Sequence, residues 1–485
     1  MAGGVVTEAA RVVAQRAEPV RSGSLRWTDG FLFSLTMPAA LIATLGFSVG
    51  SLGTWAAIAL WGVSMILAIL ANRAYAELAA MFPHKSGGIA LYAWEGWRRY
   101  FTPVGPVATF GYWFAWSSSM AIYAGIIGSL VQTEWFAGQT WTWSLGVTDV
   151  TLPRLIAAAV LVLVWAANVL GLRPTLLLTY LTAGLLLVPL AVFMFLPYLT
   201  GDWSSATFTS NLSLGSGSSW KLVLVWLYIM CWTSLGVEIC ATFTPEYRNR
   251  ARDAARALRA AALFSLAVFV LLPLGAVGTA GQPAVLREPL TFYAPAFQEL
   301  VGGAAGVMIA LMVGSLVLVI VTCMADSARA LYGISEDGMT IRELDRLNRF
   351  GVPARAMAVD LILNLGLVFF VGSTLAIVAA GNLGYIAAHV FALSALVLLR
   401  RDRPDLPRPV RLSRPAVMVT GGLAAFLVVL LLVGATSFDL TGYGGTSELV
   451  IAVGILLLSV LLFAYRRVVQ DRKRLRFREP APEIV

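Results

Sequence analysis

The segment from Trp232 to Glu238 carries the residue types best suited to bind a solute inside a membrane. It reads Trp-Thr-Ser-Leu-Gly-Val-Glu and lies within a long apolar stretch. A carboxylate at bilayer depth is costly, so its presence marks a functional position. Gly236 permits backbone angles that other residues avoid, and the hydroxyls of Thr233 and Ser234 can satisfy freed backbone groups. We therefore predict an interrupted helix whose free N–H and C=O groups face a ligand.

A second segment, from Phe33 to Ala39, is also expected to break. Pro38 has no backbone N–H and its ring clashes with the preceding turn, which frees carbonyl groups near Ser34 and Thr36. An ordinary proline kink is the alternative. The two segments are five predicted spans apart, and interrupted helices at corresponding positions of two halves indicate a substrate site at the membrane midplane. Half-helix N-termini there attract a carboxylate, and C-terminal ends attract an ammonium group.

The predicted substrate-binding residues come from both interruptions. Trp232 is expected to be an aromatic wall or a cation–π platform for an amine, with a packing tryptophan as the alternative. Glu238 is expected to carry a coupling proton or to pair with an ammonium group. The alternatives for Glu238 are a carboxylate that snorkels to the inner face or one that makes a structural hydrogen bond. The predicted binding residues are Thr36, Met37, Pro38, Ala39, Trp232, Thr233, Ser234, Leu235 and Gly236.

Charged residues near the cytoplasmic ends of two predicted spans suggest a gate. We predict an inner-gate ion pair between Glu77 and Arg329. A local pair of Glu77 with Arg73, one helical turn away, is the alternative. Either pair would place a buried carboxylate at the inner end of the second span.

Three further features are expected to be structural. Asp360 has Arg355 close by in sequence, which favours an ion pair near the membrane surface. His389 lies deep in an apolar span and is expected to be a satisfied core histidine. Residues 341–348, in the longest cytoplasmic connection, are expected to form a short amphipathic helix.

The sequence predicts no catalytic centre, no cofactor and no metal cluster. Its three cysteines lie in apolar runs, and its two histidines are too few and too far apart for a metal site. A membrane-embedded enzyme would need clustered ligands or a nucleophile–base pair, so an enzyme is not expected. The hydroxyls of Ser315 and Thr322 could together hold a sodium ion.

The elements that must carry these residues are membrane helices. The 485-residue chain is 59% hydrophobic and 13% charged, with a mean hydropathy of +0.80, whereas a soluble protein has roughly 25% charged residues. The apolar runs are continuous and about 20 residues long, which indicates helices and excludes the alternating pattern of a β-barrel. About twelve spans are predicted, near residues 29–50, 54–80, 105–131, 152–171, 175–199, 220–244, 257–279, 300–325, 355–373, 375–399, 415–436 and 447–466.

The placement of arginine predicts the orientation. Loops after the sixth, tenth and twelfth spans are basic, whereas residues 132–151 and 200–219 contain no lysine or arginine, so the basic loops and both termini are expected in the cytoplasm. The net charge of +9 arises from these loops and does not indicate a nucleic-acid partner. The arginine bias suggests a bacterial cytoplasmic membrane. The predicted divisions are a cytoplasmic tail (1–28), a transport core of ten helices (29–400), two further helices (401–466) and a basic cytoplasmic tail (467–485).

Four motifs, in order over about residues 30 to 400, resemble those of the amino acid–polyamine–organocation (APC) permeases. The motifs are Tyr75-Ala-Glu77-Leu-Ala-Ala-Met-Phe-Pro83 with Gly87-Gly88 and Tyr92, then Asn168-Val-Leu-Gly171-Leu-Arg173, then Gly236-Val-Glu238 with Pro245-Glu246-Tyr-Arg248-Asn249, and finally Ser327-Ala-Arg329 with Asp337-Gly338, Asn348 and Pro353.

The resemblance implies an all-α membrane protein with a five-plus-five inverted repeat (a LeuT-like fold), two extra helices, and broken helices 1 and 6 that hold the substrate during alternating access. The segment that begins at Trp232 is similar to the arginine/agmatine antiporter branch, in which the tryptophan stacks on the substrate. Residues 36–39 depart from the family's Gly-Ser-Gly-like break. Residues 183–185 are apolar where many proton-coupled members carry a lysine, so exchange, coupling through Glu238 and coupling to sodium all stay open.

We therefore expect a secondary active transporter that moves an amino acid across the cytoplasmic membrane, with the lipid bilayer and a coupling proton or sodium ion as partners. A transporter of polyamines or other organic amines, or a non-transporting sensor, is the alternative. A polyamine pocket needs more than one buried carboxylate, and Glu238 is the one securely placed. This favours a zwitterionic substrate.

Overall fold

The computed structural model describes residues 25–35, 37–85, 87–146, 148–171, 176–212, 219–371 and 373–480. Over these residues the protein consists of helices and one two-stranded hairpin. The elements are α2 (Trp27–Ser34), α3 (Pro38–Leu52), α4 (Thr54–Met81), α5 (Gly88–Trp97), α6 (Val104–Trp135), β1 (Thr142–Ser144), β2 (Asp149–Thr151), α7 (Leu152–Val169), α8 (Leu176–Thr200), α9 (Ser219–Leu235), η1 (Gly236–Glu246), α10 (Arg250–Ala280), α11 (Gln282–Arg287), α12 (Tyr293–Val301), η2 (Gly302–Ala304), α13 (Ala305–Glu336), η3 (Arg342–Leu344), α14 (Ala354–Phe370), α15 (Thr374–Asp402), α16 (Arg414–Thr436), η4 (Phe438–Thr441), α17 (Thr446–Tyr465) and η5 (Arg466–Gln470).

Within the described residues, eleven helical segments are long and apolar enough to cross a bilayer. These segments agree in position with eleven of the twelve predicted spans. The remaining predicted span corresponds to α14, whose 17 residues rise about 26 Å. That length is slightly less than the roughly 30 Å of a bilayer core. The chain is therefore a multi-span helical membrane protein.

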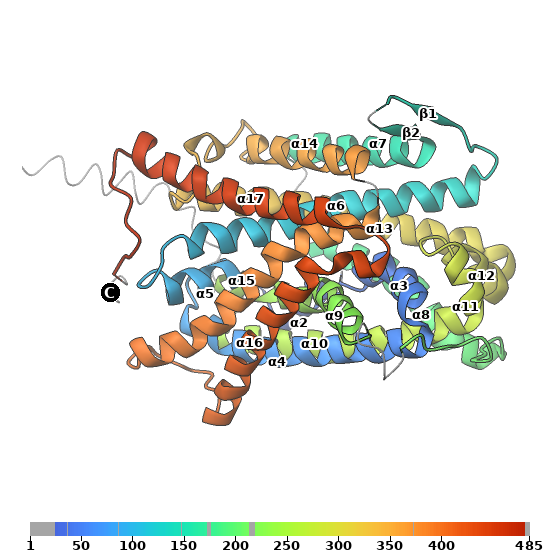
Figure 1. The fold of residues 1–485 in the computed structure, drawn as a ribbon, viewed down its shortest axis with the longest axis horizontal. Helices are drawn as coiled ribbons and strands as arrows, with labels where there is room; N and C mark the ends of the chain where they lie inside the picture. Colours follow the sequence, from blue (N-terminus) through green and yellow to red (C-terminus); the bar gives the residue numbers. More distant parts are fainter. Residues whose placement is uncertain are drawn as a thin grey trace, which may run out of the picture.

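Helices that are distant in sequence pack side by side. α6 contacts α13, α15 and α17, and α4 contacts α10; Figure 1 shows α6 and α17 along the upper side and α4 along the lower side. α6 meets α15 at a pair of glycines, where a Cβ on Gly111 would lie 2.4 Å from the carbonyl oxygen of Gly384. Small residues allow membrane helices to approach this closely. The contact holds α15 directly against α6.

The first predicted interruption is present. α2 ends at Ser34 and α3 begins at Pro38. The chain turns tightly between them, since the N–H of Met37 donates to the carbonyl oxygen of Ser34 at 3.1 Å. Proline suits the first position of a helix because an N–H there would have no helical partner. Thr36 lies outside the described residues.

The second predicted interruption is present as a change of helix type. α9 ends at Leu235, and the chain continues from Gly236 to Glu246 as a 3₁₀ helix, η1. A 3₁₀ segment of this length is unusual, and within a helical span it often marks a functional hinge. Pro245 lies inside η1, where its missing N–H opposes a regular α-helix.

The two interruptions lie side by side. The hydroxyl of Ser34 donates to the carbonyl oxygen of Val237 at 3.1 Å. The rings of Phe33 and Phe243 stack with their centroids 4.4 Å apart. The hydroxyl contact therefore joins the end of α2 to the start of η1.

The predicted amphipathic helix over residues 341–348 is wrong. The structure has a single 3₁₀ turn there (η3). Asn348 holds the following chain: its Nδ2 donates to the carbonyl oxygen of Val169 at 2.9 Å, and its Oδ1 accepts from the N–H of Phe350 at 2.9 Å. An asparagine that bonds its own backbone two residues further on favours a turn over a helix.

Candidate functional site

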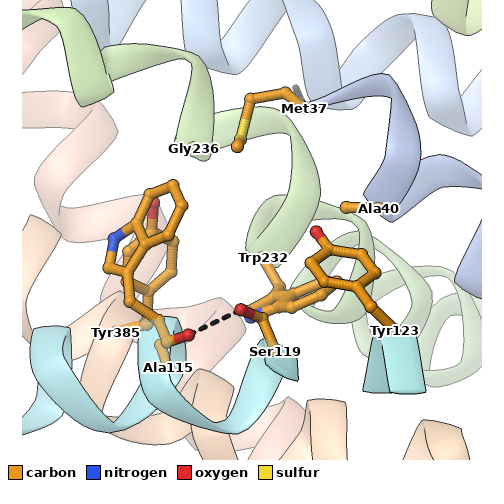
Figure 2. A pocket seen from close by; sticks show the side chains of 9 residues that line it. Met37, Ala40, Ala115, Ser119, Tyr123, Trp232, Gly236 and Tyr385 are labelled. Atoms are coloured by element: carbon orange, nitrogen blue, oxygen red, sulfur yellow. Dashed lines mark hydrogen bonds between the residues drawn. The ribbon is translucent and has the colours of Figure 1, made fainter. Parts of the chain in front are cut away.

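A cavity lies where the two interruptions meet α6 and α15. It is narrow in this structure: its water-accessible volume is about 20 Å³, about the space that one water molecule needs. In Figure 2, the side chains of Tyr385, Trp232, Tyr123 and Met37 surround this space. Its complete lining is Met37, Ala40, Ala115, Trp116, Ser119, Tyr123, Trp232, Gly236 and Tyr385.

Gly236 leaves room for the residues on either side of it. A Cβ at this position would lie 2.6 Å from Sδ of Met37 and 3.7 Å from the hydroxyl oxygen of Tyr385. The thioether of Met37 therefore occupies space that a side chain on η1 would need, and Figure 2 shows it reaching toward Gly236. Methionine adapts to irregular gaps, so this contact can close one side of the cavity without a fixed geometry.

The α6 wall contains three consecutive serines, residues 117–119. The hydroxyl of Ser119 donates to the carbonyl oxygen of Trp116 at 2.5 Å, and that of Ser118 donates to the carbonyl oxygen of Ala115 at 3.3 Å. Serines that bond back to their own helix often bend it. This turn of α6 presents Ala115, Trp116 and Ser119 to the cavity.

Glu238 lies two residues beyond Gly236 on η1 and is fully buried. The hydroxyl of Tyr112 donates to its Oε1 at 2.8 Å. Its Oε2 has no hydrogen-bond partner within the described residues, and neither does the hydroxyl of Tyr385. The rings of Tyr112 and Tyr385 are 5.8 Å apart. A carboxylate and two phenols therefore lie together beside the cavity, with hydrogen-bonding capacity unused.

The chain that carries this cavity matches a known protein family. A family model described as amino acid permease matches residues 27–461. The chain belongs to the amino acid permease family.

This result confirms the resemblance to the APC permeases and shows that the chain is a membrane transporter of that family, not an enzyme. The permease is also similar to the glutamate/serine transporter AimA of Bacillus subtilis (strain 168). The two are 21% identical over 414 residues, which cover 77% of this chain and 72% of the relative. The similarity therefore extends over most of the length of both chains.

Three of the nine predicted substrate-binding residues line the cavity of the permease: Met37, Trp232 and Gly236. Thr36 lies outside the described residues. The hydroxyl of Thr233 is buried and has no hydrogen-bond partner in the described part of the chain. The five residues that are buried without lining the cavity are Pro38, Ala39, Thr233, Ser234 and Leu235.

The sequence analysis missed the opposite wall of the cavity. Its main residues come from α6 and α15, namely Trp116, Ser119, Tyr123 and Tyr385. A signal was present on α6, because residues 117–119 are a polar run between aromatic residues in the middle of an apolar span. Polar groups at membrane depth mark functional positions. Tyr385 had no such signal, since it is one aromatic residue in a long apolar helix.

The predicted inner-gate pair is wrong for this structure. The guanidinium of Arg400 donates two hydrogen bonds to the carboxylate of Glu77, from Nε at 2.8 Å and from Nη2 at 2.5 Å. Nε of Arg408 lies 3.7 Å from Oε1 of the same carboxylate. Arg329 instead lies 3.7 Å from Asp326 on its own helix. The bidentate Arg400 contact explains the difference, because it occupies both carboxylate oxygens of Glu77. Arg400 also takes the place of Arg73, which was the alternative partner predicted for Glu77.

Asp360 is not a surface ion pair. It is fully buried, and three side chains donate to its carboxylate: Trp113 Nε1 at 3.0 Å, Ser117 Oγ at 2.6 Å and Ser327 Oγ at 2.8 Å. The expected partner Arg355 donates to the carbonyl oxygen of Glu343 instead. Asp360 thus joins α14 to α6 and α13 through neutral donors.

His389 is a buried histidine, as predicted, and its Nδ1 is 2.6 Å from the hydroxyl of Tyr75. Its Nε2 has no partner among the described residues, so the histidine is only half satisfied. The ring of Tyr385 packs edge-on against it at 4.5 Å. His389 therefore supports Tyr385, one of the residues that line the cavity.

Ser315 and Thr322 cannot share a sodium ion. They lie seven residues apart on the continuous helix α13, which separates their positions by about 10 Å along the axis. Each hydroxyl donates to a carbonyl oxygen of its own helix, Ser315 to Met312 at 2.7 Å and Thr322 to Leu318 at 3.1 Å. The proposed pairing of these two residues is wrong. No group of three or more metal-ligating side chains occurs among the described residues.

Proposed function

We propose that the permease moves an amino acid across the cytoplasmic membrane by secondary active transport, and that the cavity between the two interruptions holds the substrate. The observation that carries the proposal is the position of this cavity at the junction of two broken helices, which is where discontinuous membrane helices bind substrates. An amino acid has a carboxylate, which half-helix N-termini favour, and an ammonium group, which C-terminal ends favour. The similarity to a glutamate/serine transporter supports a substrate of this class.

We further infer alternating access of a five-plus-five inverted repeat around this cavity. The two interruptions lie at the start of α3 and at the end of α9. These positions are in the first and the sixth span, which are the first spans of the two proposed five-helix halves. The basic loops support an orientation in which both termini are in the cytoplasm. A small cavity with few fixed polar contacts suits a transporter, since the substrate must leave as well as enter.

Glu238 is the proposed coupling residue. It is buried beside the cavity, has one carboxylate oxygen without a partner in the described structure, and forms no ion pair there. A carboxylate without a cation partner at membrane depth can take up and release a proton during a transport cycle. Proton movement through Glu238 requires no lysine on α8, which agrees with the apolar residues 183–185.

Trp232 is the proposed aromatic contact for the substrate. Its side chain lines the cavity, and Figure 2 shows its ring below Tyr123. Stacking on an ammonium group contributes about 1–2 kcal/mol, or roughly tenfold in affinity.

The test is uptake of labelled amino acids and amines by purified permease in proteoliposomes, with and without pH and sodium gradients. Trp232→Ala is expected to raise the KM of the transported amino acid about tenfold or more. The matched control is Trp220→Ala, which removes an exposed tryptophan from the same helix. Absence of uptake of every amino acid, or equal KM values for the Trp232 variant and wild type, would contradict the proposal.

A further inference from the structure

His389 is a buried titratable residue to which the proposed function gives no role. It lies on α15 and is fully buried, and its Nδ1 is 2.6 Å from the hydroxyl oxygen of Tyr75 on α4. The other ring nitrogen, Nε2, has no hydrogen-bond partner within the described residues. A buried polar atom without a partner is costly, and ionisable side chains inside a membrane mark the pathways of protons and solutes.

Tyr385 and Tyr112 link His389 to the proposed coupling residue, Glu238. The ring of Tyr385 packs edge-on against the imidazole of His389, with the centroids 4.5 Å apart. It is also 5.8 Å from the ring of Tyr112, whose hydroxyl donates to Oε1 of Glu238. The hydroxyl of Tyr385 and Oε2 of Glu238 are both buried without a partner in the described structure. Unused hydrogen-bonding atoms therefore extend from the carboxylate to the imidazole.

The contact with Tyr75 leaves Nε2 of His389 able to accept a proton. When the Nδ1–H of the neutral imidazole donates to the Tyr75 oxygen, the lone pair of the ring is on Nε2. A phenol hydroxyl both accepts and donates, so Tyr385 can take the proton of the Glu238 acid and give its own proton to Nε2, directly or through one water. The O–H bond of the acid breaks, an N–H bond forms on the imidazole, and the phenol is unchanged.

The transfer creates no net charge in the membrane. It converts a neutral acid and a neutral imidazole into a carboxylate and an imidazolium, and these opposite charges stabilise each other. Glu238 interacts electrostatically with both Tyr75 and Tyr385. The other titratable side chains that interact with these two phenols include Tyr92 and Cys231, which are neutral near pH 7.

The charged residues of α4 nearest to Tyr75 belong to other surfaces of that helix. Arg73 and Glu77 are each two residues from Tyr75, which places them about 160° away around the helix. Arg73 is exposed, and Glu77 is already in an ion pair. On the other helices packed against α15, the charged side chains lie near the helix ends: Glu95, Glu134, Lys221, Arg414 and Glu448. Glu238 is therefore the carboxylate with which His389 can exchange a proton.

From this geometry we propose that His389 takes up the proton that Glu238 releases and passes it toward the end of α15 that is predicted to be cytoplasmic. His389 lies one turn beyond Tyr385 in that direction, and the basic end of the helix begins at Arg400, about 16 Å further along. The inference rests on the proposed function, because it assumes that Glu238 is the coupling residue. It makes His389 a proton-carrying residue of the transport cycle and not a packing residue alone.

The experiment compares two kinds of transport of labelled serine and glutamate by the full chain in proteoliposomes. One is net uptake driven by a pH gradient, which requires a proton to enter and leave its site in each cycle. The other is exchange of labelled for unlabelled amino acid at equal pH on both sides, which can proceed without release of the proton. His389→Gln keeps a side chain that can hydrogen-bond to Tyr75 but cannot carry a proton. We expect it to lower net uptake at least about tenfold and exchange less than about twofold.

The matched control is His84→Gln, because His84 is the other histidine of the sequence and is exposed, in contact with Arg250. Both kinds of transport are expected to stay within about twofold of wild type in this variant. Equal losses of net uptake and exchange in His389→Gln would show that His389 acts only by supporting Tyr385. Unchanged net uptake would show that it carries no proton. Either result would overturn the inference.

A second variant tests the inference if His389→Gln does not fold. Tyr75→Phe keeps the histidine and removes the hydroxyl that fixes Nδ1, so net uptake is expected to fall at least about threefold while exchange is retained. Unchanged net uptake in this variant would contradict the inference. A wild-type chain that transports amino acids without any response to a pH gradient would instead refute the coupling role of Glu238, and absence of all amino acid transport would refute the proposed function itself.

Discussion

Asp360 offers a sharp test of how the helices of this permease are held together. Its carboxylate accepts from Trp113 and Ser117 on α6 through Oδ1, and from Ser327 on α13 through Oδ2. Asp360→Ala removes the acceptor of all three donors. A buried donor without a partner costs about 1–3 kcal/mol.

The loss of the Asp360 carboxylate does not cost the three donors the same free energy. The hydroxyls of Ser117 and Ser327 can rotate toward a carbonyl oxygen of their own helix, as serines in helices commonly do. The indole N–H of Trp113 cannot rotate in this way, so it carries most of the loss. We expect Asp360→Ala to destabilise the permease by about 2–4 kcal/mol once the cavity left by the missing carboxylate is included.

Asp360→Asn is the matched comparison, because it removes the charge and keeps the shape. Its Oδ1 can still accept from Trp113 and Ser117, and its amide can donate to the hydroxyl of Ser327. The expected cost is about 1 kcal/mol or less. The two variants therefore separate the effect of lost hydrogen bonds from the effect of lost charge.

The assay is thermal unfolding of the purified protein in detergent. The measured quantity is the fraction of protein that remains monodisperse at each temperature. The expected order of melting midpoints is wild type, then Asp360→Asn close to it, then Asp360→Ala clearly below. In a Trp113→Phe background, which lacks the stranded donor, Asp360→Ala should cost about 1–2 kcal/mol less. An alanine variant as stable as wild type, or an asparagine variant as unstable as alanine, would refute the reasoning.

Two further predictions concern the cavity. Glu238→Gln is expected to weaken or abolish the dependence of uptake on pH while serine still binds, because the amide cannot exchange a proton; a pH profile identical to that of wild type, measured in proteoliposomes at fixed sodium, would leave Glu238 a structural residue. Gly236→Ala is expected to lower the uptake rate because its Cβ would lie 2.6 Å from Sδ of Met37, and Met37→Ala in the same chain should restore at least part of the rate. No rescue by the second substitution would show that the first acts through the backbone of η1.

The two interruptions could be predicted from sequence because their causes are local. Pro38 cannot continue a helix that precedes it, and Pro245 and Gly236 weaken the helix after Leu235. The spans were predictable for a similar reason, since bilayer thickness fixes their length and the arginine-rich loops separate them. These features depend on short stretches of chain, and the structure has them in the expected places.

The opposite wall of the cavity could not be predicted in this way. Trp116 and Tyr385 reach the site because α6 packs closely on α15, and that contact depends on where Gly111 meets Gly384. The apolar helices of this sequence contain many small residues. The sequence alone does not show which two of them will be in contact in the folded protein. The side chains that complete the cavity are thus fixed by tertiary packing.

The error at Asp360 has a simpler geometric cause. Arg355 precedes it by five residues, and both lie on α14. At 100° per residue, positions five apart point about 140° away from each other around a helix. Neighbours on a helix surface are three or four residues apart, so proximity in sequence did not mean proximity on the helix.

The ion pairs of Glu77 and Glu95 show why the gate was assigned to the wrong residues. The carboxylates of Glu77 and Glu95 are both almost fully buried, and each takes an arginine from the end of α15: Arg400 reaches Glu77 at 2.5 Å, and Arg403 reaches Glu95 at 3.3 Å. Each carboxylate has a second cation nearby: Nε of Arg408 lies 3.7 Å from Glu77, and Nζ of Lys85 lies 2.6 Å from Glu95. Removing one arginine therefore leaves neither carboxylate without a cation.

Arg400 and Arg403 belong to the basic loop from which the orientation of the chain is predicted. An arginine that indicates membrane orientation can therefore also form an ion pair that stabilises the fold. Glu77 further accepts from the N–H of Leu412 at 2.7 Å, which fixes the loop beyond α15 to α4. A pair of Glu77 with Arg329 would have to replace two cations and this backbone contact together. The basic loop is therefore part of the packed structure at the C-terminal end of α4, and the arginines from which the orientation is predicted also hold helices together there.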